Sequence, residues 1–472
     1  MVWSGQEIVT ATGAVASAPV ADMAFESVGT DSRAVAAGAL FVALRGAHHD
    51  AHRFVAEALR QGAAAALVED PPPGVDPARL LRVPDTLRAL GDLAAFTRRR
   101  WGGPLAAITG SNGKTTTKEM LAAIAAADGR LRGRTLATHG NLNNLIGLPL
   151  TLLRLRGDEA AAIVEMGMNA PGEIARMTAI AAPTIGVITN VGPAHLEGLG
   201  SVDGVAAAKG ELFAGLGATA TIAVNREDEH IVRLAAHFPG RRIEFGHGGE
   251  VWADAIDDRG FDGVDFTLRV GALHTRVRLR MAGRHNVQNA LAAAALAHGL
   301  GLDVETMAAG LSAAAPPKMR LEVARLANGV TGVNDAYNAN PASTEAALDT
   351  LARMPGRHIA VLGEMRELGA AAGALHRQVG AYAAACGVQW LIAVGPQGDA
   401  LAAGARAAGS IEVDECPDAA AAAALVAARW RRGDVVLVKG SRGPDDEPGV
   451  RRYGARMAEV AARLQAAAGE QA

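Results

Sequence analysis

The fold of this 472-residue chain is decided by the stretch Ile108-Thr109-Gly110-Ser111-Asn112-Gly113-Lys114-Thr115-Thr116. An apolar run, residues 105–109, predicts a buried strand at its start, and a helical pattern begins at about Lys114. A glycine-containing turn between a strand and a helix is the setting of a phosphate-binding loop. In such a loop backbone N–H groups bind phosphate oxygens, the lysine reaches the β- and γ-phosphates, and the hydroxyl after it holds Mg²⁺. The usual spacing would place a glycine at position 108, so the motif is a shortened variant, and it predicts an ATP site.

Strand and helix patterns alternate on both sides of this loop, which predicts an α/β fold with largely parallel sheets covered on both faces. The predicted strands are residues 39–44, 63–68, 105–109, 160–164, 184–189, 218–224, 329–333, 358–362, 390–394 and 434–438, and helices are predicted at 84–100 and 286–300. Two breaks divide the pattern, Trp101-Gly102-Gly103-Pro104 and Ala313-Ala314-Ala315-Pro316-Pro317. We therefore expect a small N-terminal α/β domain (1–101), a central P-loop ATPase domain (102–314) and a C-terminal Rossmann-like, doubly wound domain (315–472).

The composition excludes several classes of protein. With 46 basic and 49 acidic residues the net charge is −3, which leaves no field to attract nucleic acid. Two cysteines, Cys386 and Cys416, cannot form a disulfide framework and fit a reducing compartment. The first residues lack a signal-peptide pattern, and no stretch of about 18 residues is apolar enough to span a bilayer. We expect a cytoplasmic protein without a membrane span.

Lysine is scarce in this chain. Only five of the 46 basic residues are lysines, namely Lys114, Lys118, Lys209, Lys318 and Lys439. A lysine differs from arginine in offering a compact primary amine that acts as a point charge or can be modified. Each is therefore a candidate for a task that arginine cannot perform; lysines left over from a compositional bias would instead scatter over the surface.

Three residues could form the metal side of the predicted ATP site. Glu165 follows the strand 160–164, at the carboxyl end where α/β sheets place their ligands, and Mg²⁺ prefers oxygen ligands. His195 lies just past another strand end, and Lys209 precedes Gly210 and Glu211. Each also has a plain structural alternative: a helix cap for Glu165, a loop histidine for His195, and an ion pair with Glu211 for Lys209.

Four segments resemble the Mur ligases, ATP-dependent amino-acid or peptide ligases of bacterial cell-wall synthesis: the phosphate loop, Glu165-Met166-Gly167, Asn190 to His195, and Lys209-Gly210-Glu211. The resemblance implies that Lys209 carries a carbamate, which a guanidinium would not form as a stable group. It implies catalytic roles for Lys114, Glu165, His195 and Lys209, and two Mg²⁺ ions held by Thr115, Glu165, His195 and the carbamate. The implied ATP contacts are Gly110, Ser111, Asn112, Gly113, Lys114, Thr115, Thr116, Asn286, Asn289, Arg320 and Asp335.

Further segments are similar to the members of this family that join D-alanyl-D-alanine to UDP-MurNAc-tripeptide through an acyl phosphate. They are Thr30-Asp31-Ser32-Arg33, residues 38–46, residues 140–149, Asn334-Asp335-Ala336-Tyr337-Asn338-Ala339-Asn340-Pro341, residues 362–369 with His376, and Lys439-Gly440-Ser441-Arg442-Gly443. The resemblance implies an N-terminal domain that binds the uridine nucleotide, a C-terminal domain that binds the dipeptide and part of ATP, and a monomer. The implied contacts with the UDP-sugar and peptide are Ser32, Arg33, Arg45, Asn141, Asn143, Asn144, Asn338 and Asn340.

Several alternatives stay open at this point. A ligase that adds the third amino acid to the dipeptide precursor would carry an Asp-Asn-Pro-Arg motif, which the chain lacks. A folylpolyglutamate synthase would share the central motifs but not the N-terminal ones. A P-loop nucleotide switch would turn over ATP without a peptide acceptor, and a regulatory relative would have lost catalysis. His139 and residues 444–448 depart from the family pattern, and the last thirty or so residues have no assignment.

Overall fold

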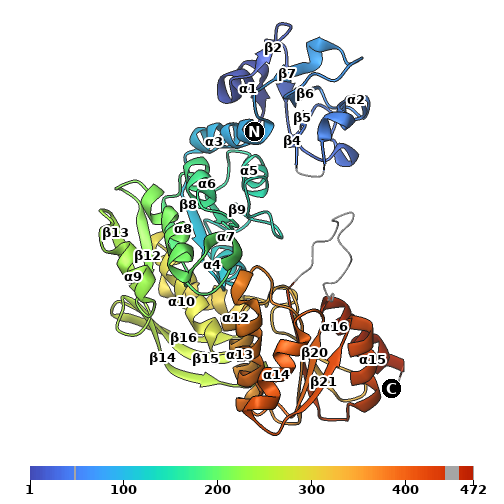
Figure 1. Ribbon diagram of the computed structural model, residues 1–472. Helices are drawn as coiled ribbons and strands as arrows, with labels where there is room; N and C mark the ends of the chain where they lie inside the picture. Colours follow the sequence, from blue (N-terminus) through green and yellow to red (C-terminus); the bar gives the residue numbers. More distant parts are fainter. Residues whose placement is uncertain (47–48, 442–456, 471–472) are drawn as a thin grey trace.

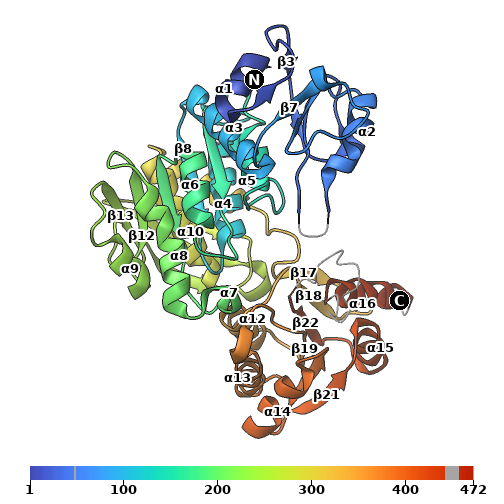
Figure 2. The ribbon, with the colours of Figure 1, turned by 45° about the horizontal axis from the view of Figure 1, so that its top comes forward.

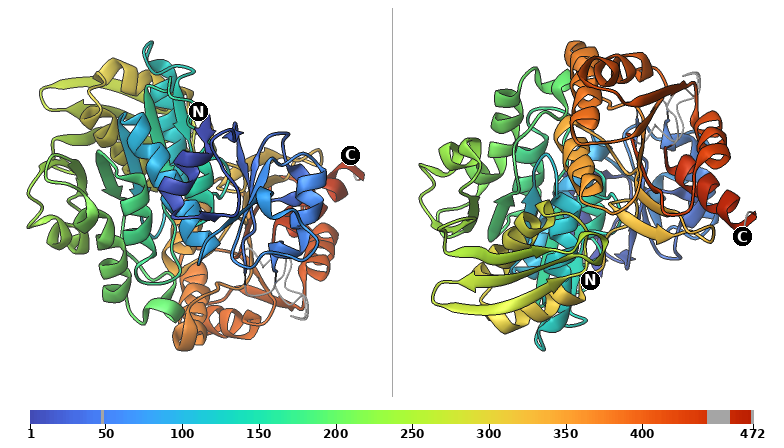
Figure 3. Two further views of the ribbon diagram at one scale, coloured as in Figure 1. Left: turned by 90° about the horizontal axis from the view of Figure 1, so that it is seen from above. Right: turned by 90° about the horizontal axis from the view of Figure 1, so that it is seen from below.

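The computed structural model describes residues 1–46, 49–441 and 457–470. Three large sheets, each covered by helices, follow one another along the chain and form the three units seen in Figure 1. This arrangement confirms the predicted α/β class and the three-part architecture. In both views of Figure 3 the C-terminal unit lies beside the central one.

The N-terminal unit holds a five-stranded sheet in the order β2-β7-β6-β5-β4, parallel except for the pairing of β2 with β7. Its strands are β2 (Val15–Ala16), β4 (Val28–Gly29), β5 (Leu40–Val42), β6 (Ala65–Val68) and β7 (Leu80–Arg82); β1 (Trp3–Ser4) pairs separately with β3 (Ala24–Phe25). On one face, α2 (Val55–Arg60) packs against Phe41 and Ala66. On the other lie α1 (Gly5–Thr12) and α3 (Thr86–Trp101), the helix predicted at 84–100.

The central unit is built on a nine-stranded sheet with β8 inside it, in the order β16-β15-β14-β13-β12-β11-β8-β10-β9. The strands are β8 (Leu105–Thr109), β9 (Thr135–Ala137), β10 (Ala161–Glu165), β11 (Ile185–Ile188), β12 (Thr221–Asn225), β13 (Arg241–Phe245), β14 (Val251–Asp258), β15 (Val264–Val270) and β16 (Leu273–Leu279). The helices are α4 (Lys114–Ala127), α5 (Gly147–Leu152), α6 (Glu173–Ala181), α7 (Leu196–Leu199), α8 (Val202–Gly215), α9 (Glu229–Ala235), α10 (His285–Gly299) and α11 (Val304–Ala313). Leu105 and Ala107 of β8 face the core shared with α5, α6 and α8, whereas Ala106 and Ile108 face α4 and α10. Because alternate residues of a strand point to opposite faces, this strand, apolar except for the buried Thr109, is buried on both sides.

The C-terminal unit has a six-stranded sheet in the order β17-β18-β22-β19-β20-β21, antiparallel only at β17 with β18. Its strands are β17 (Glu322–Arg325), β18 (Thr331–Asp335), β19 (His358–Leu362), β20 (Trp390–Val394), β21 (Glu412–Cys416) and β22 (Val435–Lys439). Helices α12 (Pro341–Ala352), α13 (Ala372–Ala385) and α14 (Gly398–Ala408) cover one face, and α15 (Ala419–Arg429) and α16 (Met457–Glu470) the other. Helices on both faces confirm the predicted doubly wound sheet.

Several elements were not predicted, among them β7, β9, β17 and β21, and the two largest differences lie elsewhere. No strand was expected between residues 225 and 285, yet β13 to β16 extend the central sheet there, with β15 antiparallel to both its neighbours. Their exposed positions carry charged residues, as in β16, where Val277 and Leu279 are buried and Arg278 is exposed. Helix α16 occupies part of the C-terminal stretch that had no assignment, and its Val460 and Leu464 are buried.

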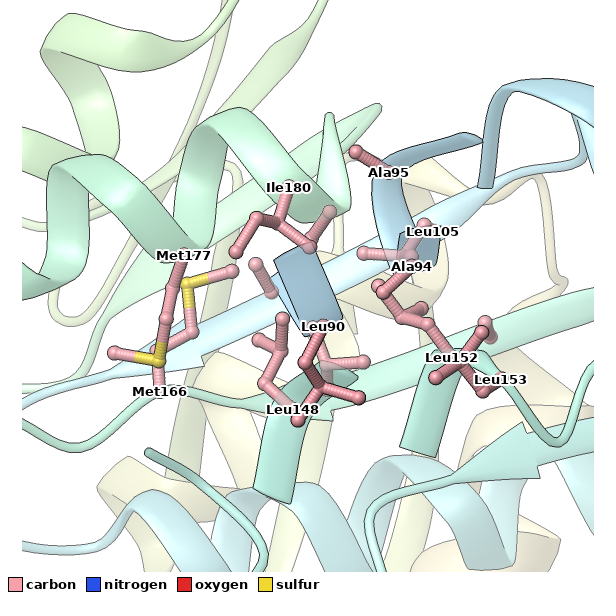
Figure 4. Close-up of a cluster of buried hydrophobic side chains, with 14 of the residues drawn as sticks. Leu90, Ala94, Ala95, Leu105, Leu148, Leu152, Leu153, Met166, Met177 and Ile180 are labelled. Atoms are coloured by element: carbon pink, nitrogen blue, oxygen red, sulfur yellow. The ribbon is translucent and has the colours of Figure 1, made fainter. Parts of the chain in front are cut away.

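Helix α3 joins the N-terminal unit to the central one through a continuous apolar core. Figure 4 shows Leu90 and Ala94 of α3 among Leu148 and Leu152 of α5 and Ile180 of α6. Polar contacts flank this core: the Arg98 guanidinium donates to the carbonyl of Ala181 at 2.7 Å, and the Trp3 indole donates to Thr97 Oγ1 at 2.9 Å. In the described part of the chain, no helix is both long and apolar enough to cross a bilayer.

Replacing Leu90 with alanine removes a fully buried side chain from this core. The cavity and the lost burial are expected to lower the free energy of unfolding by about 2–5 kcal/mol. Urea unfolding followed by tryptophan fluorescence measures the change, because Trp3 and Trp101 both border the same core. Val15→Ala, at a site 70% exposed, is the control and should change the value by less than about 0.5 kcal/mol. Equal effects of the two substitutions would contradict the packing of α3.

Candidate active site

A cavity of about 880 Å³ lies between the carboxyl ends of the central strands and the C-terminal unit. Figure 2 shows these two units meeting around α7 and α12. Sixteen of the predicted site residues line it: Ser111, Asn112, Gly113, Lys114, Thr116, Asn141, Asn143, Asn144, Glu165, His195, Asn286, Asn289, Arg320, Asp335, Asn338 and Asn340. Residues separated by more than two hundred positions in the sequence thus face one space.

The turn from β8 into α4 brings its backbone close to the neighbouring segments. Gly110 and Gly113 have φ of +150° and +81°. A Cβ at Gly110 would lie 1.9 Å from Thr189 Oγ1, and one at Gly113 would lie 2.1 Å from Asn289 Oδ1. The amide of Asn112 donates to Asn190 Oδ1 at 2.9 Å, which ties the turn to the loop after β11. Both glycines are therefore required by conformation and by space.

Lys114, the first residue of α4, folds back over this turn. Its Nζ donates to the carbonyl of Gly110 at 2.7 Å. Burial lowers the pKa of Lys114, and the carboxylates of Glu165 and Glu367 oppose that effect. A lysine at a helix N-terminus, next to free backbone N–H groups, provides a positive site for an anion.

Among the predicted metal residues, Glu165 and His195 each have a buried polar atom without a hydrogen-bond partner in the described part of the chain, and Lys209 is also buried. Glu165 Oε1 accepts a hydrogen bond from Asn143 Nδ2 at 2.8 Å, but its buried Oε2 has no partner among the described residues. Lys209 is 1% exposed and forms no hydrogen bond or ion pair in that same part of the chain. Burial, and then the charge of Lys114, hold the pKa of Lys209 well below its ordinary value. The predicted alternative of a Lys209–Glu211 pair is not seen, because Glu211 accepts from the backbone of Gly172 and Ala175.

This donor set fits Mg²⁺. A buried carboxylate oxygen without a partner is costly, and a divalent cation would satisfy it. No group of three or more His, Cys, Asp or Glu side chains suited to a metal occurs within residues 1–46, 49–441 and 457–470. Mg²⁺ does not need such a group, because it commonly takes one or two carboxylates and completes its shell with substrate phosphates and water.

The C-terminal unit contacts the phosphate loop and the metal residues directly. Asn340 Nδ2 donates to Asn112 Oδ1 at 2.8 Å, and the Arg320 guanidinium donates to Thr115 Oγ1 at 3.0 Å. His195 Nδ1 lies 2.5 Å from Glu367 Oε2, and this contact lowers the pKa of Glu367. Arg320 also stacks over the Tyr337 ring, 4.3 Å from its centroid.

The predicted ATP contacts Asn286, Asn289 and Asp335 already have polar partners within the protein. Asn289 Nδ2 donates to Asn286 Oδ1 at 2.9 Å at the start of α10. Asp335 pairs with the buried Lys439 at 2.6 Å through Oδ2 and accepts from the Leu321 amide at 3.0 Å through Oδ1. These residues border the cavity.

The remaining predicted residues do not line the cavity. Gly110, Thr115 and Lys209 are not among its lining residues. Ser32, Arg33 and Arg45 belong to the N-terminal unit, where Arg33 pairs with Asp31 at 2.9 Å and Arg45 with Asp70 at 2.8 Å. Of the last quoted motif, Arg442 and Gly443 lie outside the described residues.

Glu367, Tyr337 and Lys439 line the cavity but were not predicted as site residues. Lys439 carried a signal, since it is one of only five lysines. The five lysines are not scattered over the surface, as a compositional bias would predict. Three of them, Lys114, Lys209 and Lys439, lie at or beside the cavity. Lys118 is buried against the carbonyl of Thr138, and only Lys318 is exposed among the five.

Gly113→Ala tests the phosphate-binding turn. The substitution forces a non-glycine residue into positive φ and into contact with Asn289, at a cost of about 1–3 kcal/mol, so ADP–Mg²⁺ should bind about tenfold or more weakly. Titration with a fluorescent ADP analogue measures the affinity. Gly217→Ala is the control, because Gly217 lacks a positive φ and has open space around it. Unchanged affinity in Gly113→Ala would refute the assignment of this turn.

Comparison with known proteins covers nearly the whole chain. Three family descriptions match: "Mur ligase family, catalytic domain" at residues 24–98, "Mur ligase middle domain" at 108–297, and "Mur ligase, glutamate ligase domain" at 319–442. The UDP-N-acetylmuramoyl-tripeptide–D-alanyl-D-alanine ligase of Escherichia coli is 38% identical over 91% of this chain and 94% of its own. The enzyme of the same name from Synechocystis is 39% identical over 89% and 90%.

Solved structures agree with these sequences. MurF from Acinetobacter baumannii superposes with a TM-score of 0.87 at 34% identity, covering 93% of this chain and 96% of its own. MurF from Thermotoga maritima in complex with ADP gives 0.82 at 27% identity, covering 94% and 98%. The Escherichia coli FolC structure, at 16% identity and a TM-score of 0.60, shares the fold. The three family descriptions and the relatives match along nearly the whole length, including the phosphate loop and the segments around the cavity. This chain therefore belongs to the Mur ligase family.

Proposed function

We propose that this chain joins D-alanyl-D-alanine to UDP-MurNAc-tripeptide at the expense of ATP, which makes UDP-MurNAc-pentapeptide, ADP and phosphate. One observation carries the proposal: a relative named for this ligation matches 91% of the chain at 38% identity. The cavity supports it, because the phosphate loop and the Tyr337-Asn338-Ala339-Asn340-Pro341 run line the same space. The third-residue ligase is a weaker alternative, since the solved diaminopimelate ligase is only 20% identical.

The chemistry requires two anions to meet. The terminal carboxylate of the tripeptide attacks the γ-phosphorus of ATP, ADP leaves, and the dipeptide amine then displaces phosphate from the acyl phosphate. Repulsion between the carboxylate and the γ-phosphate opposes the first step, so positive groups that hold both in place lower its barrier. Lys114 and the N-terminus of α4 would provide that charge, together with Arg320 of the C-terminal unit, which contacts Thr115.

Mg²⁺, with two ions expected, would neutralise phosphate charge during transfer. Thr115, Glu165, His195 and a carbamate on Lys209 would hold it. A neutral amine attacks CO₂ at carbon and then loses a proton to give this carbamate. The low pKa of Lys209 favours the neutral amine, and a carbamate would give this buried side chain the ligand oxygens that it lacks.

The remaining assignments complete the proposal. Asn286, Asn289, Arg320 and Asp335 contact ATP together with the loop 110–116, whereas Asn141, Asn143, Asn144, Asn338 and Asn340 contact the peptide part of the substrates. Ser32, Arg33 and Arg45 bind the UDP-sugar in the N-terminal domain. The three domains are 1–101, 102–314 and 315–472, and the chain works as a cytoplasmic monomer.

The decisive test is phosphate release from ATP and Mg²⁺ with each substrate added or omitted. The proposal expects release only with both UDP-MurNAc-tripeptide and D-alanyl-D-alanine, and a pentapeptide product by mass spectrometry. Turnover that ignores the dipeptide would refute the ligase and favour a nucleotide switch.

Lys209→Arg tests the carbamate separately. Arginine keeps the charge but forms no stable carbamate, so the ligation rate should fall by about 10- to 100-fold. The direct readout is NMR of protein supplied with ¹³C-bicarbonate, which should show a carbamate carbon in the parent chain and none in the variant. Lys318→Arg, at an exposed lysine, is the matched control and should keep both the rate and the signal. A parent chain without the carbamate signal would contradict the proposal.

A further inference from the structure

His195 and Glu367 share an unusual backbone state. His195 has φ of +56° and Glu367 has φ of +62°, although neither is a glycine. They come from different domains, His195 from the loop after β11 and Glu367 from the loop after β19. Non-glycine residues stay in this region only where the surrounding structure holds them there, and such positions cluster at functional sites.

The two residues meet at a close joint between the domains. His195 Nδ1 lies 2.5 Å from Glu367 Oε2, and the Glu197 amide donates to the Glu367 carbonyl at 3.0 Å. A Cβ at Gly369 would lie 3.3 Å from the Glu197 Cα, and Leu196 packs against the apolar core of the C-terminal unit. Figure 2 shows α7 on the side of the central unit that faces the C-terminal one.

The loop that carries Glu367 is anchored within its own domain. The Met365 amide donates to Nε2 of the buried His376 at 2.8 Å, and the Arg366 amide donates to Ser441 Oγ at 3.0 Å. The loop that brings Glu367 to His195 is therefore held in place by hydrogen bonds of its two preceding residues.

An ordinary ion pair between domains does not explain this geometry. Arg353 and Asp258 also join the central and C-terminal units, at 3.2 Å, and neither has a positive φ. That pair, with Arg353 half exposed, thus joins the two units without any strained backbone, so an ion pair alone does not require the positive φ of His195 and Glu367.

The short contact determines which nitrogen of His195 is free. The Glu367 carboxylate oxygen lies 2.5 Å from Nδ1, without hydrogen-bond geometry in this structure, so it occupies the Nδ1 side of the ring and leaves Nε2 as the nitrogen available to a metal. Histidines that bind metals are commonly oriented in this way by a carboxylate on the other nitrogen.

We propose that Glu367 is a positioning residue whose carboxylate, beside Nδ1, favours the proton on that nitrogen and leaves Nε2 of the His195 imidazole free for the metal bound with ATP. Because Glu367 belongs to the C-terminal domain, His195 is correctly oriented only while the two domains are docked. The inference rests on the proposed function for the metal site, but not on the identity of the peptide substrates.

The experiment uses the full-length chain and the variants Glu367→Ala, Glu367→Gln and, as control, Arg353→Gln. One readout is the ¹⁵N NMR signature of the His195 tautomer at constant pH. The other is the affinity for Mn²⁺ by electron paramagnetic resonance with ADP present. Neither needs UDP-MurNAc-tripeptide or D-alanyl-D-alanine, so a failed ligation assay would leave these results interpretable.

Glu367→Ala should lose the Nδ1–H signature and bind Mn²⁺ about tenfold or more weakly. Glu367→Gln keeps an acceptor oxygen, so it should retain the tautomer and lose less affinity, while Arg353→Gln should match the parent chain in both. Glu367→Ala that behaves as the parent chain would overturn the proposal. An equal loss in Arg353→Gln would also overturn it, because any contact between the domains would then suffice.

Discussion

At the end of β8 the chain turns into α4 through Gly110 and Gly113, and the backbone passes so close to Thr189 and Asn289 that a Cβ would collide at either glycine. This turn leaves the first N–H groups of α4 free and places Lys114 over them. The buried strands on either side of β8 then bring Glu165 and the loop of His195 to the same edge of the sheet. The site therefore depends on one turn that only glycine can make.

The central domain does not complete this site alone. Arg320, Asn340 and Glu367, all from the C-terminal unit, contact Thr115, Asn112 and His195 respectively. A reaction that passes through an acyl phosphate gains from such an arrangement, because closure excludes water from a reactive intermediate. If the C-terminal domain binds the acceptor as proposed, the same domain also contacts the proposed phosphate site, and acceptor binding would be coupled to phosphate transfer.

Much of the fold could be predicted because its central strands are short apolar runs between breaks. β8, β19 and β20 have the predicted bounds, since each is a short, mostly apolar run in which every position is buried. β13 to β16 were missed because charged residues at exposed positions, such as Glu244 of β13 and Arg276 and Arg278 of β16, interrupt their apolar positions. The contact of Glu367 with His195 could not be predicted, because 172 positions separate them and only the docking of two domains brings them together.

Positional isotope exchange in ATP labelled with ¹⁸O at the β–γ bridge tests most directly whether an acyl phosphate forms in this cavity. If the tripeptide carboxylate attacks the γ-phosphate in this cavity, ATP and UDP-MurNAc-tripeptide alone should form acyl phosphate and ADP reversibly. The label should then move from the bridge to the non-bridging β-oxygens without D-alanyl-D-alanine present. Label that stays in the bridge with the tripeptide bound, or that moves without it, would contradict the proposed order of chemistry.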